Sequence, residues 1–159
     1  LKELNPDLGI VIAFRMLPEV VWAMPRLGTF NLHASLLPQY RGAAPINWAI
    51  INGERETGVT TFLLNHEIDK GAIIEQETTA ILPEDNIGTL YDRLMEIGSH
   101  LVTRTVDKLA EGNYTTIEQM QSARCSSCGK YHTTPFSYYF SKYNYCPNCG
   151  AKMEVSEDA

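Results

Sequence analysis

The sequence lacks the features that define a membrane or secreted protein. Its longest apolar run, residues 9–14, has the length of a strand and falls far short of the roughly 18 residues that a membrane-spanning helix needs. Its N-terminus begins with Leu rather than Met and has neither the basic start nor the apolar stretch of a secretory signal. These absences exclude a membrane span, and we expect a cytoplasmic protein without a membrane partner.

Basic residues are scarce in the first 122 residues, which contain nine Lys and Arg against sixteen Asp and Glu. Nonspecific binding to nucleic acid needs clustered Lys and Arg, so this acidic part is not built for it. Any RNA partner would have to be held by a local patch or by segments outside this sequence. The overall composition, with 44% hydrophobic and 20% charged residues, is typical of a folded globular protein.

Cysteine is absent from the first 124 residues, whereas the last 35 contain all four, Cys125, Cys128, Cys146 and Cys149. Aromatic residues become dense at the same place: seven fall within residues 131–145, against eight in the first 122 residues. This change of composition predicts two parts, a larger domain over residues 1–121 and a minidomain over residues 122–155.

Strand and helix patterns alternate along the first part. A continuous apolar run predicts a strand over residues 7–14 that is buried on both faces, followed by a short helix over residues 18–24. The same reading gives strands at residues 28–33, 58–65 and 73–81, and helices at Pro45–Ile51 and Ile87–Glu111. Gly112 would end the last helix, and Asp85 or Asn86 could cap its start. The alternation predicts an α/β layered domain.

The residues best suited to chemistry lie between positions 31 and 71. Asn31 and His33 are two apart on a predicted strand, so their side chains project from the same face. Asp69 lies in a loop close to Gly71. An amide and an imidazole can polarise a carbonyl and hold its oxyanion, while a carboxylate fixes the imidazole and assists proton removal. Each residue alone also has a structural interpretation, because a single histidine is usually packed in the core and an Asp close to a Gly usually makes a turn.

Several motifs occur together in a fixed order. They are Asn-x-His with a later Asp (Asn31, His33, Asp69), Ser-Leu-Leu-Pro-x-x-Arg-Gly at 35–42, Arg-Gly-Ala-Ala-Pro-Ile at 41–46 and Glu-Thr-Gly-Val-Thr at 56–60. In this order they resemble the folate-dependent formyltransferase family over roughly residues 1–115. The last two motifs look most like the members that act on methionyl-tRNA. The fold that the resemblance implies is a partial Rossmann-like α/β formyltransferase domain, because the family begins with further strands.

The resemblance implies an enzyme that transfers a formyl group from 10-formyltetrahydrofolate to the amino group of initiator methionyl-tRNA, with Asn31, His33 and Asp69 as the catalytic residues. It also implies a set of substrate-binding residues: Phe14, Arg15, Met16, Leu17, Ser35, Leu36, Leu37, Pro38, Arg41 and Gly42. Three other readings stay open: an amino sugar linked to a nucleotide as acceptor, hydrolysis of the formyl folate, and an inactive fragment whose cysteine segment is the working part.

The cysteine segment contains two Cys-x-x-Cys-Gly motifs, and seventeen residues separate Cys128 from Cys146. Each motif can supply two thiolates to a tetrahedral metal site. The spacing resembles a zinc ribbon, with Zn²⁺ held by Cys125, Cys128, Cys146 and Cys149 in a structural role. Iron, as in rubredoxins, is the alternative metal. The family members that act on methionyl-tRNA end instead in a β-barrel that helps to hold the tRNA, so this tail departs from the pattern of these members.

Overall fold

The computed structural model describes residues 2–13, 17–116, 123–124 and 131–132. The chain divides into two compact units, Leu1–Glu118 and Gln119–Ala159. In the second unit, strand β5 (Ala123–Arg124) pairs antiparallel with strand β6 (Tyr131–His132). All four cysteines of the predicted zinc ribbon lie outside the described residues.

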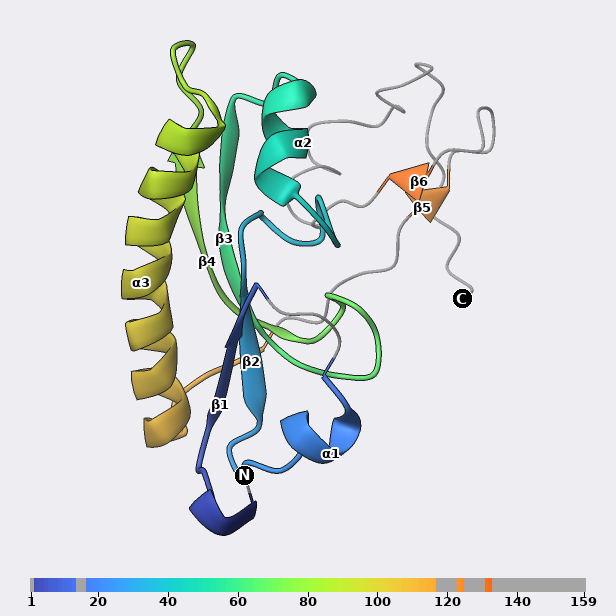
Figure 1. The fold of residues 1–159 in the computed structure, drawn as a ribbon, viewed down its shortest axis with the longest axis vertical. Helices are drawn as coiled ribbons and strands as arrows, with labels where there is room; N and C mark the ends of the chain where they lie inside the picture. Colours follow the sequence, from blue (N-terminus) through green and yellow to red (C-terminus); the bar gives the residue numbers. More distant parts are fainter. Residues whose placement is uncertain (1, 14–16, 117–122, 125–130, 133–159) are drawn as a thin grey trace. The chain divides into compact units, whose positions relative to one another are not determined.

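The first unit is built on a four-stranded mixed sheet (Figure 1). Its elements, in order, are a 3₁₀ turn (Lys2–Leu4), β1 (Gly9–Ile12), α1 (Glu19–Trp22), β2 (Thr29–His33), α2 (Pro45–Ile51), β3 (Glu56–Leu63), β4 (Ile73–Ala80) and α3 (Ile87–Glu111). The strands follow one another in the order β1-β2-β3-β4, with β1 parallel to β2 and β3 antiparallel to both of its neighbours. The predicted α/β class is confirmed.

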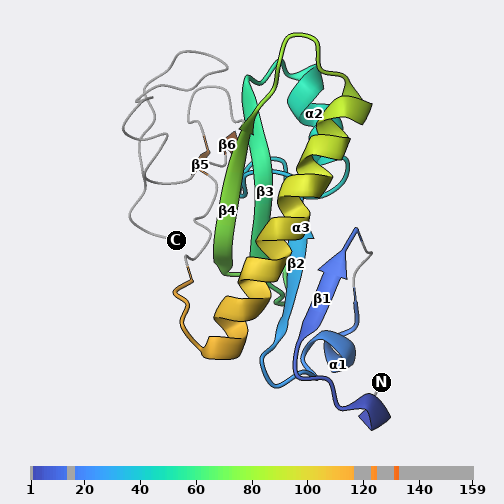
Figure 2. The same cartoon turned by 90° about the vertical axis from the view of Figure 1, so that its left-hand side faces the viewer.

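Helix α3 runs along one face of this sheet (Figure 1 and Figure 2). Its buried positions recur at three- and four-residue intervals and form one stripe: Leu90, Leu94, Gly98, Leu101, Thr105 and Leu109. The buried Thr105 hydroxyl lies 2.9 Å from the hydroxyl of Thr61 on β3, so its polar group is paired inside the core. Within the described parts of the chain, no helix combines the length and apolar character needed to cross a bilayer.

Strand β1 differs from its prediction. Instead of a long strand buried on both faces, the chain forms a four-residue strand in which Ile10 is 47% exposed and Ile12 is 57% exposed. The reason is that α3 packs mainly against β3 and β4, whereas β1 lies at the far end of the strand order. An uninterrupted apolar run predicted two covered faces, but the run alone does not say which elements cover them.

The pairing of β3 with β4 contains a β-bulge. Thr61 is opposite Glu75 and Phe62 is opposite Ile73, so Ile74 is an extra residue on β4. Ile74 packs with Leu109 of α3 in one core cluster, whereas Ile73 packs with Phe62 in another. The bulge therefore lets two consecutive isoleucines contribute to cores on opposite faces of the sheet.

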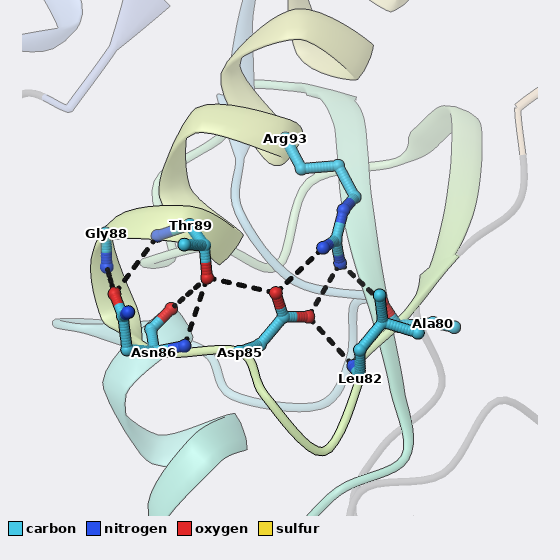
Figure 3. Close-up of polar contacts among 7 residues, drawn as sticks. All are labelled: Ala80, Leu82, Asp85, Asn86, Gly88, Thr89 and Arg93. Carbon is cyan, nitrogen blue, oxygen red and sulfur yellow. Dashed lines mark hydrogen bonds and ion pairs between the residues drawn. The ribbon is translucent and has the colours of Figure 1, made fainter.

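The start of α3 is fixed by a dense set of polar contacts (Figure 3). The Asn86 side chain accepts from the Gly88 and Thr89 amides, which confirms it as the helix cap. Asp85 instead receives two hydrogen bonds of 2.8 Å from the Arg93 guanidinium and one from the Leu82 amide. The Arg93 guanidinium, followed by the Leu82 amide, holds the pKa of the Asp85 carboxyl well below its usual range.

Replacing Asp85 with Asn should destabilise the protein at neutral pH, because the paired Arg93 would lose its counter-charge. A carboxyl whose pKa is depressed by folding stabilises the native state above its unfolded pKa, near 4, and loses this contribution as the pH falls further. We therefore expect a lower urea midpoint for Asp85→Asn at pH 7 and a smaller difference from the wild type at pH 3. Asp92→Asn, at an exposed site on the same helix, is the control. Equal midpoints at pH 7 would contradict this account.

Candidate active site

Asn31 and His33 lie on the face of the sheet opposite α3. Their neighbours Phe30 and Leu32 belong to the core clusters that contain α3 residues. Because side chains alternate along a strand, Asn31 and His33 project from the other side. The prediction that these two residues share a face is therefore confirmed by the strand register.

The loop between β3 and β4 brings Asp69 to the same place. The Nδ1 atom of His33 lies 4.0 Å from the Oδ2 atom of Asp69, with the two side chains 9% and 14% exposed. Asp69 has a left-handed backbone conformation, with φ of 51°. An imidazole and a carboxylate that are 36 positions apart in the sequence thus meet in a largely buried setting.

Residues of the predicted substrate-binding motif hold Asp69 in position. The backbone amide of Gly42 donates a 2.9 Å hydrogen bond to Asp69 Oδ2. Gly42 has φ of +85°, a conformation that suits glycine. Burial lowers the pKa of the neighbouring Arg41, while the negative charges of Asp69 and Glu67 act in the opposite direction. Arg41 therefore places a positive charge beside the carboxylate.

The loop that carries Asp69 is fixed by further contacts on either side. Lys70 and Glu67 form a 2.8 Å ion pair across the turn. The His66 ring lies edge-on to Trp22 of α1, with ring centroids 5.3 Å apart. These contacts limit how far the Asp69 backbone can move, which suits a side chain that has to meet His33 at a fixed distance.

Four other predicted substrate-binding residues form the segment that follows β2. Leu37 and Pro38 are buried, and Leu36 is partly buried. Ser35 is fully buried and donates a 2.6 Å hydrogen bond to the Gln39 carbonyl. The buried Thr60 hydroxyl donates to the Ser35 carbonyl and accepts from the Leu37 amide, which ties this segment to β3. These contacts give the segment its shape, and contact with a substrate stays a prediction.

The remaining predicted site residues follow β1. Leu17 is partly buried. Phe14, Arg15 and Met16 lie outside the described residues. Their assignment to substrate binding is therefore still a prediction.

The sequence analysis did not predict one contact of the site. The His33 Nε2 atom donates a 2.9 Å hydrogen bond to the backbone carbonyl of Tyr40. A backbone acceptor carries no side-chain signal, so no motif could have pointed to it. Tyr40 occupies a variable position of the Ser-Leu-Leu-Pro-x-x-Arg-Gly motif, which gave no reason to single it out.

The side-chain amide of Asn31 has hydrogen-bonding capacity that the described residues do not satisfy. Its Oδ1 atom is buried and has no hydrogen-bond partner among the described residues. Buried polar atoms are normally paired, so an orphan beside His33 is a place where a ligand can bind. The arrangement offers a carbonyl-recognising amide, a proton-accepting imidazole and a carboxylate to stabilise the protonated ring.

Within the described ranges, no group of three or more His, Cys, Asp or Glu side chains could hold a metal ion.

A mixed α/β domain that joins an amide, an imidazole and a carboxylate in this way is suited to enzymes that transfer a carbonyl-containing group. The family described as Formyl transferase matches residues 1–106, more than half of the chain. The chain therefore belongs to the formyl transferase family.

Close relatives and solved structures agree with this assignment. The methionyl-tRNA formyltransferase of Parabacteroides distasonis is 66% identical over 119 residues, which cover 75% of this chain and 37% of that protein. The Bacteroides fragilis protein of the same name is 62% identical over 123 residues, covering 77% of this chain and 38% of that protein. The chain thus spans less than two fifths of these relatives.

Solved structures of other formyltransferases share the fold at lower identity. The phosphoribosylglycinamide formyltransferase of Bacillus halodurans is 30% identical with a TM-score of 0.63, covering 68% of this chain and 56% of that one. The formyltransferase PseJ of Anoxybacillus kamchatkensis is 26% identical with a TM-score of 0.66, covering 80% and 65%. Its structure contains a UDP-linked amino sugar derivative and tetrahydrofolate.

Proposed function

We propose that the chain is the catalytic part of an enzyme that transfers a formyl group from 10-formyltetrahydrofolate to the amino group of methionyl-tRNA. The observation that carries the proposal is the meeting of His33 Nδ1 and Asp69 Oδ2 at 4.0 Å beside the unpartnered buried amide oxygen of Asn31. Family membership and the 62–66% identity to methionyl-tRNA formyltransferases support the choice of reaction and acceptor.

The three residues divide the chemistry between them. When bound, the formyl folate supplies the carbonyl carbon that the amino nitrogen attacks. The Asn31 amide can rotate to present its NH₂ group to the formyl oxygen, where negative charge develops. His33 takes the proton that leaves the amine as the new carbon–nitrogen bond forms, and Asp69 stabilises the imidazolium that results. The proton then returns to the departing folate nitrogen.

The folate would lie close to Asp69 and to the residues after β1. We propose Phe14, Arg15, Met16 and Leu17 as its contacts, together with the β3–β4 loop. Arg41 and Gly42 also lie close to Asp69, and we propose that they face the acceptor. The tRNA would need additional surface, because the first 122 residues are acidic and lack clustered Lys and Arg.

An acceptor assay tests the proposed function directly. The protein would be incubated with labelled 10-formyltetrahydrofolate and, separately, with methionyl-tRNA, a UDP-linked amino sugar or no acceptor. We expect label to appear in methionyl-tRNA alone. Label in the amino sugar would show that the sugar, and not methionyl-tRNA, is the acceptor. Formate release without any acceptor would show that the protein is a hydrolase.

A binding titration separates an inactive chain from a wrong assignment. Formyl folate binding should be measurable by calorimetry, and Arg41→Ala should leave it nearly unchanged if Arg41 faces the acceptor. Leu17→Ala should weaken it, because Leu17 is one of the proposed folate contacts. Absence of folate binding would reject the proposed donor.

We also propose that Cys125, Cys128, Cys146 and Cys149 hold one structural Zn²⁺ through four thiolates. Support comes from the two Cys-x-x-Cys-Gly motifs and their spacing. A segment of about 35 residues is too small to fold on hydrophobic burial alone, so metal binding and folding should be coupled.

Metal analysis of protein purified from zinc-containing medium should find about one zinc per chain. Cys146→Ser should lower this value to near zero, because the site loses one of its four ligands. Chelation should remove the zinc while leaving the circular dichroism of the first unit largely unchanged, since no cysteine lies there. Stoichiometric iron would identify a rubredoxin-like site, and metal-free protein with disulfides under reducing conditions would contradict the proposal.

A further inference from the structure

We propose that Tyr40 is a positioning residue that fixes the protonation pattern of the His33 ring. Its backbone carbonyl holds the ring proton on Nε2 and thereby makes Nδ1, the nitrogen that faces Asp69, the proton acceptor. This inference deepens the proposed function and rests on it for its kinetic consequences.

The first step follows from donor and acceptor chemistry. The Tyr40 carbonyl can only accept a hydrogen bond, and it lies 2.9 Å from His33 Nε2. Nε2 must therefore carry a hydrogen. A neutral imidazole has a single N–H, so Nδ1 then has a lone pair and no proton. Nδ1 is also the atom that lies 4.0 Å from Asp69 Oδ2.

Two acceptors that face one another at this distance do not bond directly, but they can share a donor placed between them. An amino group with more than one hydrogen meets this need, because it can donate to Nδ1 and to Oδ2 at the same time. When the amine loses a proton to Nδ1, the His33 ring becomes a cation with two donors. The Tyr40 carbonyl and the Asp69 carboxylate are already in place to stabilise it.

The carbonyl is placed by an unusual backbone conformation. Tyr40 has φ of 55°, a left-handed conformation that disfavours residues with a Cβ atom. Such a conformation persists only where surrounding contacts determine it. Without those contacts, the peptide could rotate and the acceptor for Nε2 would move away.

The side chain of Tyr40 supplies these contacts. Its hydroxyl donates a 2.5 Å hydrogen bond to Glu54 Oε1 and accepts one of 3.1 Å from Asn52 Nδ2. Asn52 is the C-cap residue that follows α2, and the Glu54 amide donates a hydrogen bond back to the carbonyl of Ala49 in that helix. The end of α2 thus anchors the tyrosine ring, and the ring anchors the carbonyl that faces His33.

The test is nitrogen-15 NMR of the histidine rings, combined with kinetics. The sequence has four histidines, and the resonances that disappear in His33→Gln identify His33. Tyr40→Phe removes only the hydroxyl, and Glu54→Ala removes only its acceptor. Glu54→Gln keeps an acceptor oxygen, and Tyr91→Phe removes an exposed hydroxyl from α3 as a control.

In the wild type, the neutral His33 ring should carry its proton on Nε2. Tyr40→Phe and Glu54→Ala should both transfer part of the population to the Nδ1–H form and lower kcat about tenfold with little change in KM. Glu54→Gln and Tyr91→Phe should behave like the wild type.

A wild-type ring that is protonated on Nδ1 would overturn the proposal. An unchanged tautomer and kcat in both Tyr40→Phe and Glu54→Ala would overturn the role of Tyr40, and using two variants guards against a misfolded one. The NMR result does not depend on turnover. If the tautomer shifts as expected in a protein that does not formylate methionyl-tRNA, the proposed acceptor fails while the role of Tyr40 is supported.

Discussion

Replacing His33 with Ala or Asp69 with Asn should reduce kcat for formyl transfer by on the order of 100-fold or more. The first change removes the group that accepts the amine proton. The second removes the negative charge that stabilises the imidazolium 4.0 Å away. Asn at position 69 still offers an oxygen to the Gly42 amide, so the loop should keep its position and the loss should fall on kcat rather than on folding. Initial rates with 10-formyltetrahydrofolate and methionyl-tRNA measure the effect.

Matched variants show whether the loss is specific to the site. His100→Ala and Asp92→Asn make the same chemical changes at exposed positions of α3 and should leave kcat within about twofold of the wild type. Near-normal turnover in both His33→Ala and Asp69→Asn would remove these residues from the catalytic machinery.

Replacing Gly71 with Ala should cost about 3 kcal/mol or more of unfolding free energy. A Cβ atom at this position would lie 1.5 Å from the carbonyl oxygen of Leu63, which is rigid backbone of β3. The two chain segments are joined there by a 2.9 Å hydrogen bond from the Leu63 amide to the Ala72 carbonyl. Since domains are stable by only about 5–15 kcal/mol, this substitution should lower the urea midpoint sharply.

Gly53→Ala is the control for Gly71→Ala. Gly53 has φ of +67°, but nothing lies within 4 Å of an added Cβ atom, so only backbone strain of about 1 kcal/mol is expected. Similar urea midpoints for the two variants would show that the β3–β4 loop can move aside. The close approach to Leu63 would then not explain why position 71 is a glycine.

Helices were predicted from the sequence with greater accuracy than the sheet was. The bounds of α2 and α3 agree with the predicted Pro45–Ile51 and Ile87–Glu111, because the proline, the cap residues and the apolar period are all local signals. The partners of each strand depend on distant parts of the chain. Neither the antiparallel pairing of β2 with β3 nor the exposed isoleucines of β1 follows from a local pattern.

The same difference between local signals and contacts of distant residues holds for the candidate site. Alternation along one strand was enough to place Asn31 and His33 on one face. The approach of Asp69 was expected from motif order alone, and its distance required the structure. The carbonyl of Tyr40 and the amide of Gly42 act through the backbone, so residue identities could not reveal them.

The hydrogen bond from the Gly42 amide to Asp69 joins the segment after β2 to the loop between β3 and β4. Under the proposed function, the acceptor contacts the first segment and the folate contacts the second. A ligand that restricts the remaining motion of one segment also restricts the other through this shared bond, so the second ligand loses less conformational entropy when it binds. The two substrates should therefore bind with positive cooperativity, and by thermodynamic reciprocity each should raise the affinity for the other by the same factor.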